Sequence, residues 1–258
     1  MSRVQSADGT HIDYEVVGSG PAVILVDGAM CYRDAGPMRG LAAALADAWT
    51  VVLYDRRGRG GSGDTAPYRV DKEIDDIEAL LGAVGGRASL FGISSGGALA
   101  TLAAARLGPA VDRLIVFEPP YMPEPARGGA AAYTAELTSA LAAGDRDGAV
   151  AAFLRRVGTP APAVDGMRQS PGWAGMTAIA PTLAYDDAVM ADSAPPVSAS
   201  RIVVPTLALA GGASPEFLQW GAKALAEAVP HGEFRVLPGQ GHDAGPAVLA
   251  AAVGQRAT

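Results

Sequence analysis

The sequence predicts an α/β fold with a mainly parallel sheet, helices on both of its faces and an inserted helical cap. Short apolar runs rich in β-branched and aromatic residues alternate with helix-like segments, as in sheets whose strands are joined by helical crossovers. The 258 residues suffice for one substantial hydrophobic core. We therefore expect one folding unit that carries the cap as an insertion.

The strands are expected where the apolar runs stand. Turn residues separate most of these runs, and the turn Ala7-Asp8-Gly9 joins the first two. The expected strands cover residues 2–7, 11–17, 21–28, 50–55, 88–94, 113–118, 204–212 and 233–239. Pro119 and Pro120 prevent the strand that ends at Glu118 from continuing.

The helices are expected between these runs. One begins near Asp71, because apolar residues recur at helical spacing up to Val84 and the opening turns are acidic. A last helix is expected from about Pro246. From 121 to 198 strand signals disappear, and helical stretches alternate with Gly/Pro-rich breaks. We interpret residues 121–198 as a helical cap inserted into a core formed by residues 1–120 and 199–258.

Composition excludes several classes of partner. A net charge of −7 disfavours nucleic acid, whose phosphates require a basic surface. No apolar run approaches the roughly 20 residues that cross a bilayer, and the first residues lack the pattern of a secretory signal. These features predict a cytoplasmic protein with neither a membrane nor a nucleic-acid partner.

Metal and cofactor chemistry is not expected either. Cys31 is the only cysteine, so neither an intramolecular disulfide nor a cysteine metal site can form. The three histidines, His11, His231 and His242, show no short metal-ligand spacing. A cofactor-free reaction is therefore favoured.

The strongest chemical signal is the sequence Gly92-Ile93-Ser94-Ser95-Gly96, which matches G-x-S-x-G. It follows a predicted strand and precedes a predicted helix, and the flanking glycines let strand and helix approach closely. This context predicts a nucleophile at Ser94, whereas a Gly/Ser-rich turn without chemistry is the alternative.

A serine hydroxyl needs a neighbouring base, and His242 is the best candidate. It follows the last predicted strand, in a loop that can reach the strand–helix turn at Ser94. His11 lies in an early strand and His231 precedes its strand, so both are interpreted as ordinary surface residues.

With Ser94 and the late segment Gly239-Gln240-Gly241-His242, the chain resembles the α/β-hydrolase superfamily over essentially its whole length. The resemblance implies the chain order serine, acid, histidine. Many relatives have an aspartate soon after the strand at 204–212, but Ser214 stands there in this chain. The sequence is similar to a branch that includes zearalenone lactonases, in which an acidic residue follows the preceding strand, so Glu118 is the expected acid. Glu216 and Asp243 are weaker candidates.

Two backbone N–H groups should hold the oxyanion of a tetrahedral intermediate. One is expected from Ser95, the residue after the nucleophile. The second is expected from the loop Asp27-Gly28-Ala29, with Gly28 implied first by the resemblance and Ala29 as the alternative. The charge of Asp27 would oppose an oxyanion unless the carboxylate points away.

Two other sequence patterns could indicate a different kind of site. Residues 58–63, GRGGSG, match the G-x-G-x-x-G spacing of a dinucleotide site, but no helix opens directly after them. They are interpreted as a flexible loop. Asp186 and Asp187 are neighbours on a predicted helix and point in different directions, so solvation or cap packing is favoured over a two-carboxylate site.

The sequence thus predicts a serine hydrolase that cleaves a small-molecule carboxylic ester or lactone through an acyl-enzyme, without a cofactor. In the cap, the expected apolar lining of the substrate pocket is Tyr121, Trp173, Met176 and Leu183, although each also suits packing within the cap. Ala29 is also expected to contact the substrate. The alternatives are a non-enzymatic small-molecule receptor on the same fold, a cofactor-free perhydrolase, a carbon–carbon bond hydrolase and a nicotinamide-dependent oxidoreductase.

Overall fold

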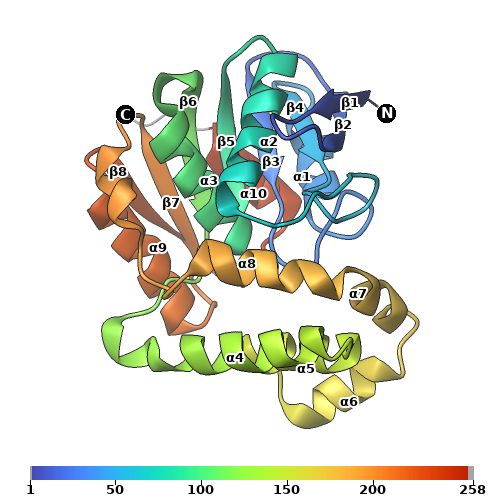
Figure 1. Cartoon of the computed structure of the whole chain (residues 1–258). Helices are drawn as coiled ribbons and strands as arrows, with labels where there is room; N and C mark the ends of the chain where they lie inside the picture. Colours follow the sequence, from blue (N-terminus) through green and yellow to red (C-terminus); the bar gives the residue numbers. More distant parts are fainter. Residues whose placement is uncertain (1, 255–258) are drawn as a thin grey trace.

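The apolar runs form one eight-stranded sheet in the computed structural model, which describes residues 2–254 (Figure 1). The strands are β1 (Ser2–Gln5), β2 (His11–Val17), β3 (Ala22–Val26), β4 (Thr50–Tyr54), β5 (Ala88–Ile93), β6 (Val111–Phe117), β7 (Thr206–Gly211) and β8 (Gly232–Leu237). Their spatial order is β1-β2-β4-β3-β5-β6-β7-β8. The pairs β1–β2 and β2–β4 are antiparallel and the other pairs are parallel, which confirms the predicted α/β class.

Helices cover both faces of the sheet, and each face has its own apolar cluster. On one face α2 (Val70–Ala83), α3 (Ser95–Leu107) and α9 (Glu216–Ala228) pack against side chains such as Ile24, Leu90 and Val116. On the other face α1 (Met38–Leu45) and α10 (Pro246–Gly254) pack against the alternate side chains. The inner parallel strands, such as β3, β5 and β7, are buried on both faces, as expected from their continuous apolar sequences.

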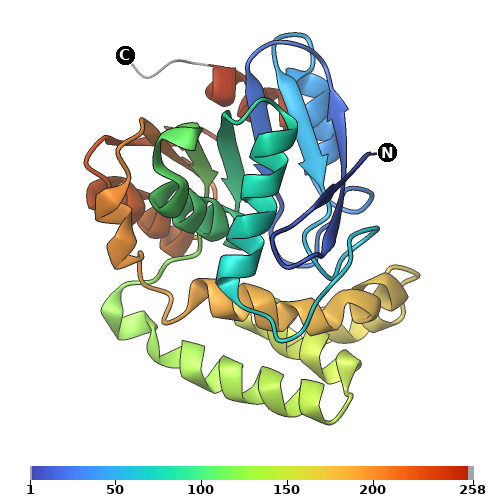
Figure 2. The ribbon, with the colours of Figure 1, turned by 45° about the horizontal axis from the view of Figure 1, so that its top comes forward.

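Between β6 and β7 the chain forms only helices. These are α4 (Gly128–Ala142), α5 (Arg146–Arg156), α6 (Ala161–Arg168), α7 (Trp173–Ile179) and α8 (Leu183–Met190), together with short 3-10 turns. In Figures 1 and 2, α8 lies between the sheet-bearing part of the molecule and the layer formed by α4 and α5. This segment contains a third apolar cluster, separate from the two on the sheet. The division of the chain at residues 121 and 198 stays a prediction.

The fold brings several strand ends to one edge of the sheet. The loops after β3, β5, β6, β7 and β8 all lie at the carboxyl end of the parallel strands, which is where open α/β sheets bind their ligands. Ser94, Glu118 and His242 belong to three of these loops. No helix among residues 2–254 is long and apolar enough to cross a membrane.

Candidate active site

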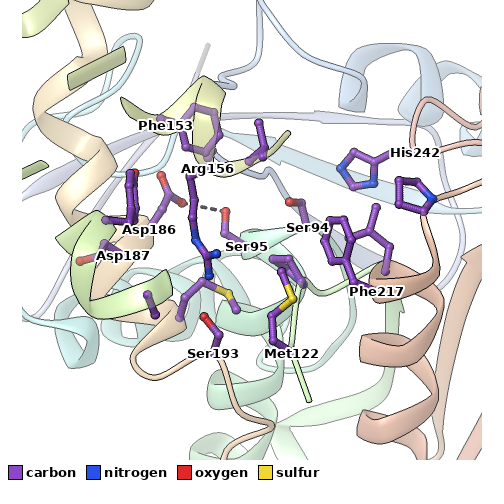
Figure 3. Close-up of a pocket in the computed structure, with 18 residues that line it drawn as sticks. Ser94, Ser95, Met122, Phe153, Arg156, Asp186, Asp187, Ser193, Phe217 and His242 are labelled. Atoms are coloured by element: carbon purple, nitrogen blue, oxygen red, sulfur yellow. Dashed lines mark hydrogen bonds between the residues drawn. The ribbon is translucent and has the colours of Figure 1, made fainter. Parts of the chain in front are cut away.

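Ser94 is the single residue between β5 and α3. Its backbone has φ 54° and ψ −130°, a conformation that non-glycine residues rarely adopt. The turn is held from both sides: the Ser94 N–H donates to Phe117 O at 2.9 Å, and the Gly97 N–H donates to Ser94 O at 2.9 Å. The strained backbone lifts the hydroxyl out of the sheet edge and into the cavity shown in Figure 3.

The flanking glycines are needed because backbone passes close to them. A Cβ at Gly92 would collide with the backbone of Gly96 and Gly97, and a Cβ at Gly96 would collide with Val26 and Asp27. The glycines of the G-x-S-x-G pattern are therefore required by a tight strand-to-helix turn, as the sequence suggested.

Glu118 and His242 meet at the same edge. The Nδ1 atom of His242 lies 2.5 Å from Oε2 of Glu118, and the Gly211 N–H donates to Oε1 of Glu118 at 2.7 Å. Glu118 has no exposed surface, whereas the His242 side chain is 44% exposed. The Phe117 ring stacks near the imidazole with ring centroids 6.1 Å apart. A fully buried carboxylate thus fixes the orientation of an accessible imidazole.

The other candidate acids do not reach His242. Glu216 is exposed at the start of α9, and Asp243 is exposed beside His242. Among residues 2–254, Glu118 is the carboxylate that bonds to the imidazole. Ser214 is buried near the end of β7, and its hydroxyl has no hydrogen-bond partner in the described chain. The geometry therefore favours Glu118, as the sequence did.

The loop after β3 approaches Ser94 closely at Gly28. A Cβ at Gly28 would lie 3.2 Å from the Ser94 Cβ, so only glycine fits there without displacement. Arg56 Nη1 donates to Asp27 O at 3.2 Å, and Arg59 Nη1 donates to Gly28 O at 2.6 Å. Because each peptide carries its N–H opposite its carbonyl, these bonds turn the N–H groups of Gly28 and Ala29 away from the two arginines.

Asp27 itself points away from the cavity. Its carboxylate is buried close to Gly36, and its Oδ1 has no hydrogen-bond partner among the described residues. Burial raises the pKa of Asp27 to about 7, although the charges of Arg59 and Arg56 oppose the rise. Burial and the charge of Asp27 together raise the pKa of the Cys31 thiol to about 12, which suits a packing role for that residue.

A buried ion network lies behind the site. Arg56 makes two hydrogen bonds to Glu73 at 2.7 Å and one to Asp186 Oδ1 at 2.7 Å, and Arg59 donates to Asp186 Oδ2 at 2.6 Å. The Ser95 hydroxyl donates to Asp186 Oδ1 at 2.8 Å (Figure 3). Asp186 therefore connects α8 to the turn at Ser94 and, through the arginines, to the loop after β3.

The G-x-G-x-x-G segment is part of this network. Arg59 is almost fully buried and paired, the Gly58 N–H donates to Gly63 O at 2.9 Å, and the Gly61 N–H donates to Asp55 Oδ2 at 2.9 Å. The expectation of a flexible loop was wrong, because these bonds hold the segment against the core.

One cavity of about 280 Å³ opens at Ser94. Its wall is mostly apolar. It is formed by the loop after β3, by the segment between β6 and α4, and by residues of α4, α5, α8 and α9. The lining residues are Ala29, Ser94, Ser95, Pro120, Met122, Ala130, Tyr133, Phe153, Arg156, Val157, Asp186, Asp187, Met190, Ser193, Pro215, Phe217, Leu218 and His242. Ser94, Ser95, His242 and Ala29 thus share one cavity, with Gly28 and Glu118 directly behind it.

The four predicted lining residues of the cap lie elsewhere, which corrects that expectation. Tyr121 is 2% exposed and packs in the core beneath the sheet edge. Trp173 donates from Nε1 to Asp147 Oδ1 at 2.8 Å, outside the cavity. Met176 and Leu183 pack in the apolar cluster of the helices between β6 and β7. Their helical faces turn toward neighbouring helices, so their apolar surface stabilises the insertion.

Comparison with known families agrees with this geometry. The family model described as the alpha/beta hydrolase family matches residues 19–252, which is nearly the whole chain. The chain belongs to the alpha/beta hydrolase family.

Two solved structures and one curated protein are similar to this alpha/beta hydrolase in sequence or fold. The chain is 44% identical to an alpha/beta hydrolase from Sphaerobacter thermophilus, with 98% of each chain covered and a TM-score of 0.88. It shares the fold of a thermophilic esterase from Thermogutta terrifontis at 20% identity, with 98% and 96% covered and a TM-score of 0.74. It is 41% identical over 92 residues to the uncharacterized hydrolase YraK of Bacillus subtilis, a match that spans 34% of this chain and 33% of that protein.

Several residues of the hydrolase's cavity escaped the sequence reasoning. Phe153 and Arg156 stand three residues apart on α5 and share one helical face, a spacing that could have grouped them. Asp186 and Asp187 were expected to serve solvation or cap packing. Asp186 instead bonds to Arg56, Arg59 and Ser95, and both carboxylates line the cavity. No group of three or more His, Cys, Asp or Glu side chains suited to a metal ion occurs among residues 2–254.

Proposed function

We propose that this alpha/beta hydrolase cleaves a small carboxylic ester or lactone through an acyl-enzyme on Ser94. The observation that carries the proposal is the shared cavity of Ser94 and His242, with His242 bonded to the buried Glu118. A serine on a strained turn, an accessible imidazole and a buried carboxylate are the parts that acyl transfer needs.

In the proposed reaction, His242 takes the proton of Ser94 as the hydroxyl oxygen attacks the carbonyl carbon. The N–H groups of Ser95 and of Gly28 or Ala29 stabilise the oxyanion, since Ser95 begins α3 and has no intrahelical partner for its N–H. His242 then gives the proton to the leaving alkoxide. Glu118 positions the imidazole and stabilises its charged form.

Deacylation follows with the same groups. His242 removes a proton from water, the hydroxide oxygen attacks the acyl carbon, and the Ser94 oxygen leaves with the proton. An ester yields an acid and an alcohol. A lactone yields one hydroxy acid, because its alcohol stays attached to the acyl group.

The test is hydrolysis of short p-nitrophenyl esters and a small panel of lactones. We expect turnover by the wild type, and loss of at least about a thousandfold in kcat for Ser94→Ala and His242→Ala. His231→Ala is the matched control, because that histidine is exposed and lies outside the cavity. Hydrolysis that survives Ser94→Ala in a folded protein would refute the proposal.

A further inference from the structure

The cavity at Ser94 contains a charge that the acyl-transfer chemistry does not use. Apart from the phenol of Tyr133, the cavity lining has four acidic or basic side chains: Arg156, Asp186, Asp187 and His242. Asp186 is neutralised by Arg56 and Arg59, and His242 belongs with Glu118. Arg156 and Asp187 remain without a role in the proposed reaction.

Arg156 has no hydrogen bond or ion pair with any other residue of the described chain. Its neighbour Arg155 is exposed and pairs with Glu136 at 2.5 Å. A guanidinium has five donors and keeps its charge at every ordinary pH, so a half-buried one normally has a partner. In Figure 3 the Arg156 side chain extends into the cavity, on the other side of Ser95 from His242.

The surroundings leave room for the guanidinium and for a ligand. A Cβ at Gly129 would lie 3.3 Å from Nη1 of Arg156, so the start of α4 allows the side chain to pass. Ser193 and Asp187 also line this end of the cavity. The charges of Asp187 and Arg156 act on the phenol of Tyr133, which is another lining residue. Much of the remaining cavity wall is apolar, and includes Met122, Phe153, Phe217 and Leu218.

Asp187 is the group that opposes an anion here. It forms no ion pair with Arg156, although the charge of Arg156 acts on it. Burial raises the pKa of Asp187 above its ordinary value, so its environment disfavours the negative form. The cavity therefore offers one unpaired cation, one carboxylate that is costly to ionise, and an apolar path to the reactive serine.

We infer that Arg156 binds a carboxylate of the substrate, so that the ester or lactone cleaved at Ser94 carries a free carboxylate on a short apolar chain. This inference rests on the proposed function for its reaction, but not for its binding site. The planar fork of Arg156 matches a carboxylate, and the cavity of about 280 Å³ suits a small acyl group. In this reading Arg156 determines specificity and takes no part in bond cleavage.

The experiment compares mono-p-nitrophenyl esters of succinate, glutarate and adipate with neutral esters of the same chain length. We expect the wild type to prefer one charged ester over its neutral counterpart. Arg156→Gln should lower kcat/KM for that charged ester by about 10- to 100-fold, mainly through KM, and change the neutral ester by less than about twofold. Asp187→Asn should increase the preference for the charged ester.

Arg155→Gln is the matched control, since it removes an exposed arginine from the same helix. It should leave both kinds of ester unchanged. Equal losses on charged and neutral esters in Arg156→Gln would overturn the inference, because they would indicate a structural role. A wild type without preference for any charged ester would overturn it as well.

A binding measurement separates this inference from the proposed function. Calorimetry with Ser94→Ala and the dicarboxylates succinate, glutarate and adipate should show binding that Arg156→Gln abolishes. If the dicarboxylates bind in this way but the wild type hydrolyses no ester, the result would support the carboxylate site and refute ester hydrolysis. Hydrolysis of neutral esters without dicarboxylate binding would keep the hydrolase and overturn the site.

Discussion

At the scale of single residues, Glu118 is the acid that we propose for the triad, placed at the end of a strand. Its backbone has a positive φ of 51°, and its carboxylate accepts from Gly211 while it contacts His242. Ser214, at the position where the resemblance implies an aspartate, is buried and contributes no charge. The Glu118 carboxylate lies at the end of β6, the strand next to β7, and contacts the imidazole from there.

Replacing Glu118 by glutamine should therefore reduce ester turnover strongly. The amide cannot stabilise the imidazolium and can hold the wrong tautomer, so kcat should fall by about 10²- to 10⁴-fold with the fold intact. Steady-state kinetics of Glu118→Gln, Glu216→Gln and Asp243→Asn measure this. Near-normal activity in Glu118→Gln, with a large loss in either of the other two, would place the acid elsewhere.

Asp27 should make stability depend on pH. Because its pKa in the folded protein is raised to about 7, the folded state holds a proton that the unfolded state releases near pH 4. The free energy of unfolding should thus fall as the pH rises toward 7. Between pH 5 and pH 8 the wild type should lose about 2–3 kcal/mol relative to Asp27→Asn, at about 1.4 kcal/mol per pH unit up to the pKa.

Urea denaturation of wild type and Asp27→Asn at a series of pH values tests this. All other titrating groups are common to both proteins, so they cancel in the difference. Parallel stability curves would show that Asp27 titrates normally in the folded protein.

At the scale of elements, α8 is coupled to the catalytic edge by Asp186. This one carboxylate accepts from Arg56, Arg59 and Ser95, and all four side chains are buried. The two arginines also hold the carbonyls of the loop after β3. The position of the loop after β3 therefore depends on a helix that is far away in the sequence.

Asp186→Ala should destabilise the fold by about 3–5 kcal/mol, because it leaves Arg59 buried without its ion pair. The neighbouring Asp187→Ala is the control and should change the free energy of unfolding by less than about 1 kcal/mol, since Asp187 forms no ion pair in the described chain. Denaturant midpoints of the two variants give the comparison. Equal destabilisation would contradict the importance of the network.

The element scale also explains what the sequence could not predict. Strand ends are marked locally by apolar runs and turn residues, so Ser94, Glu118 and His242 could be placed at one edge. Which face of a cap helix points to the cavity depends on packing with other helices. Tyr121, Trp173, Met176 and Leu183 were misplaced for this reason, and Arg156 was not recognised.

At the scale of the whole molecule, two helical layers on the sheet carry an insertion in which α6 and α7 are little buried. The strands β3, β5, β6 and β7 are buried almost throughout, whereas α7 has no buried residue and α6 has one, Val164. The order of strands and helices was predictable because each depends on local pattern. The spatial order of the strands came only from the structure.

Hydrogen exchange should reflect this difference in packing. Amides of α6 and α7 should exchange much earlier than those of β5 and β6, because local opening of the former exposes little apolar surface. Exchange followed by mass spectrometry resolves these segments. Equal protection of α6, α7 and the central strands would contradict the description of the insertion as the less stable part.

The central claim is that Ser94 is the nucleophile, activated by His242 and Glu118. The most direct test is covalent labelling with a fluorophosphonate, followed by mass spectrometry of the digested protein. We predict one adduct per chain, on the peptide that contains Ser94, absent from Ser94→Ala and formed much more slowly in Glu118→Gln. Labelling at another residue, or equal labelling of Ser94→Ala, would contradict the account.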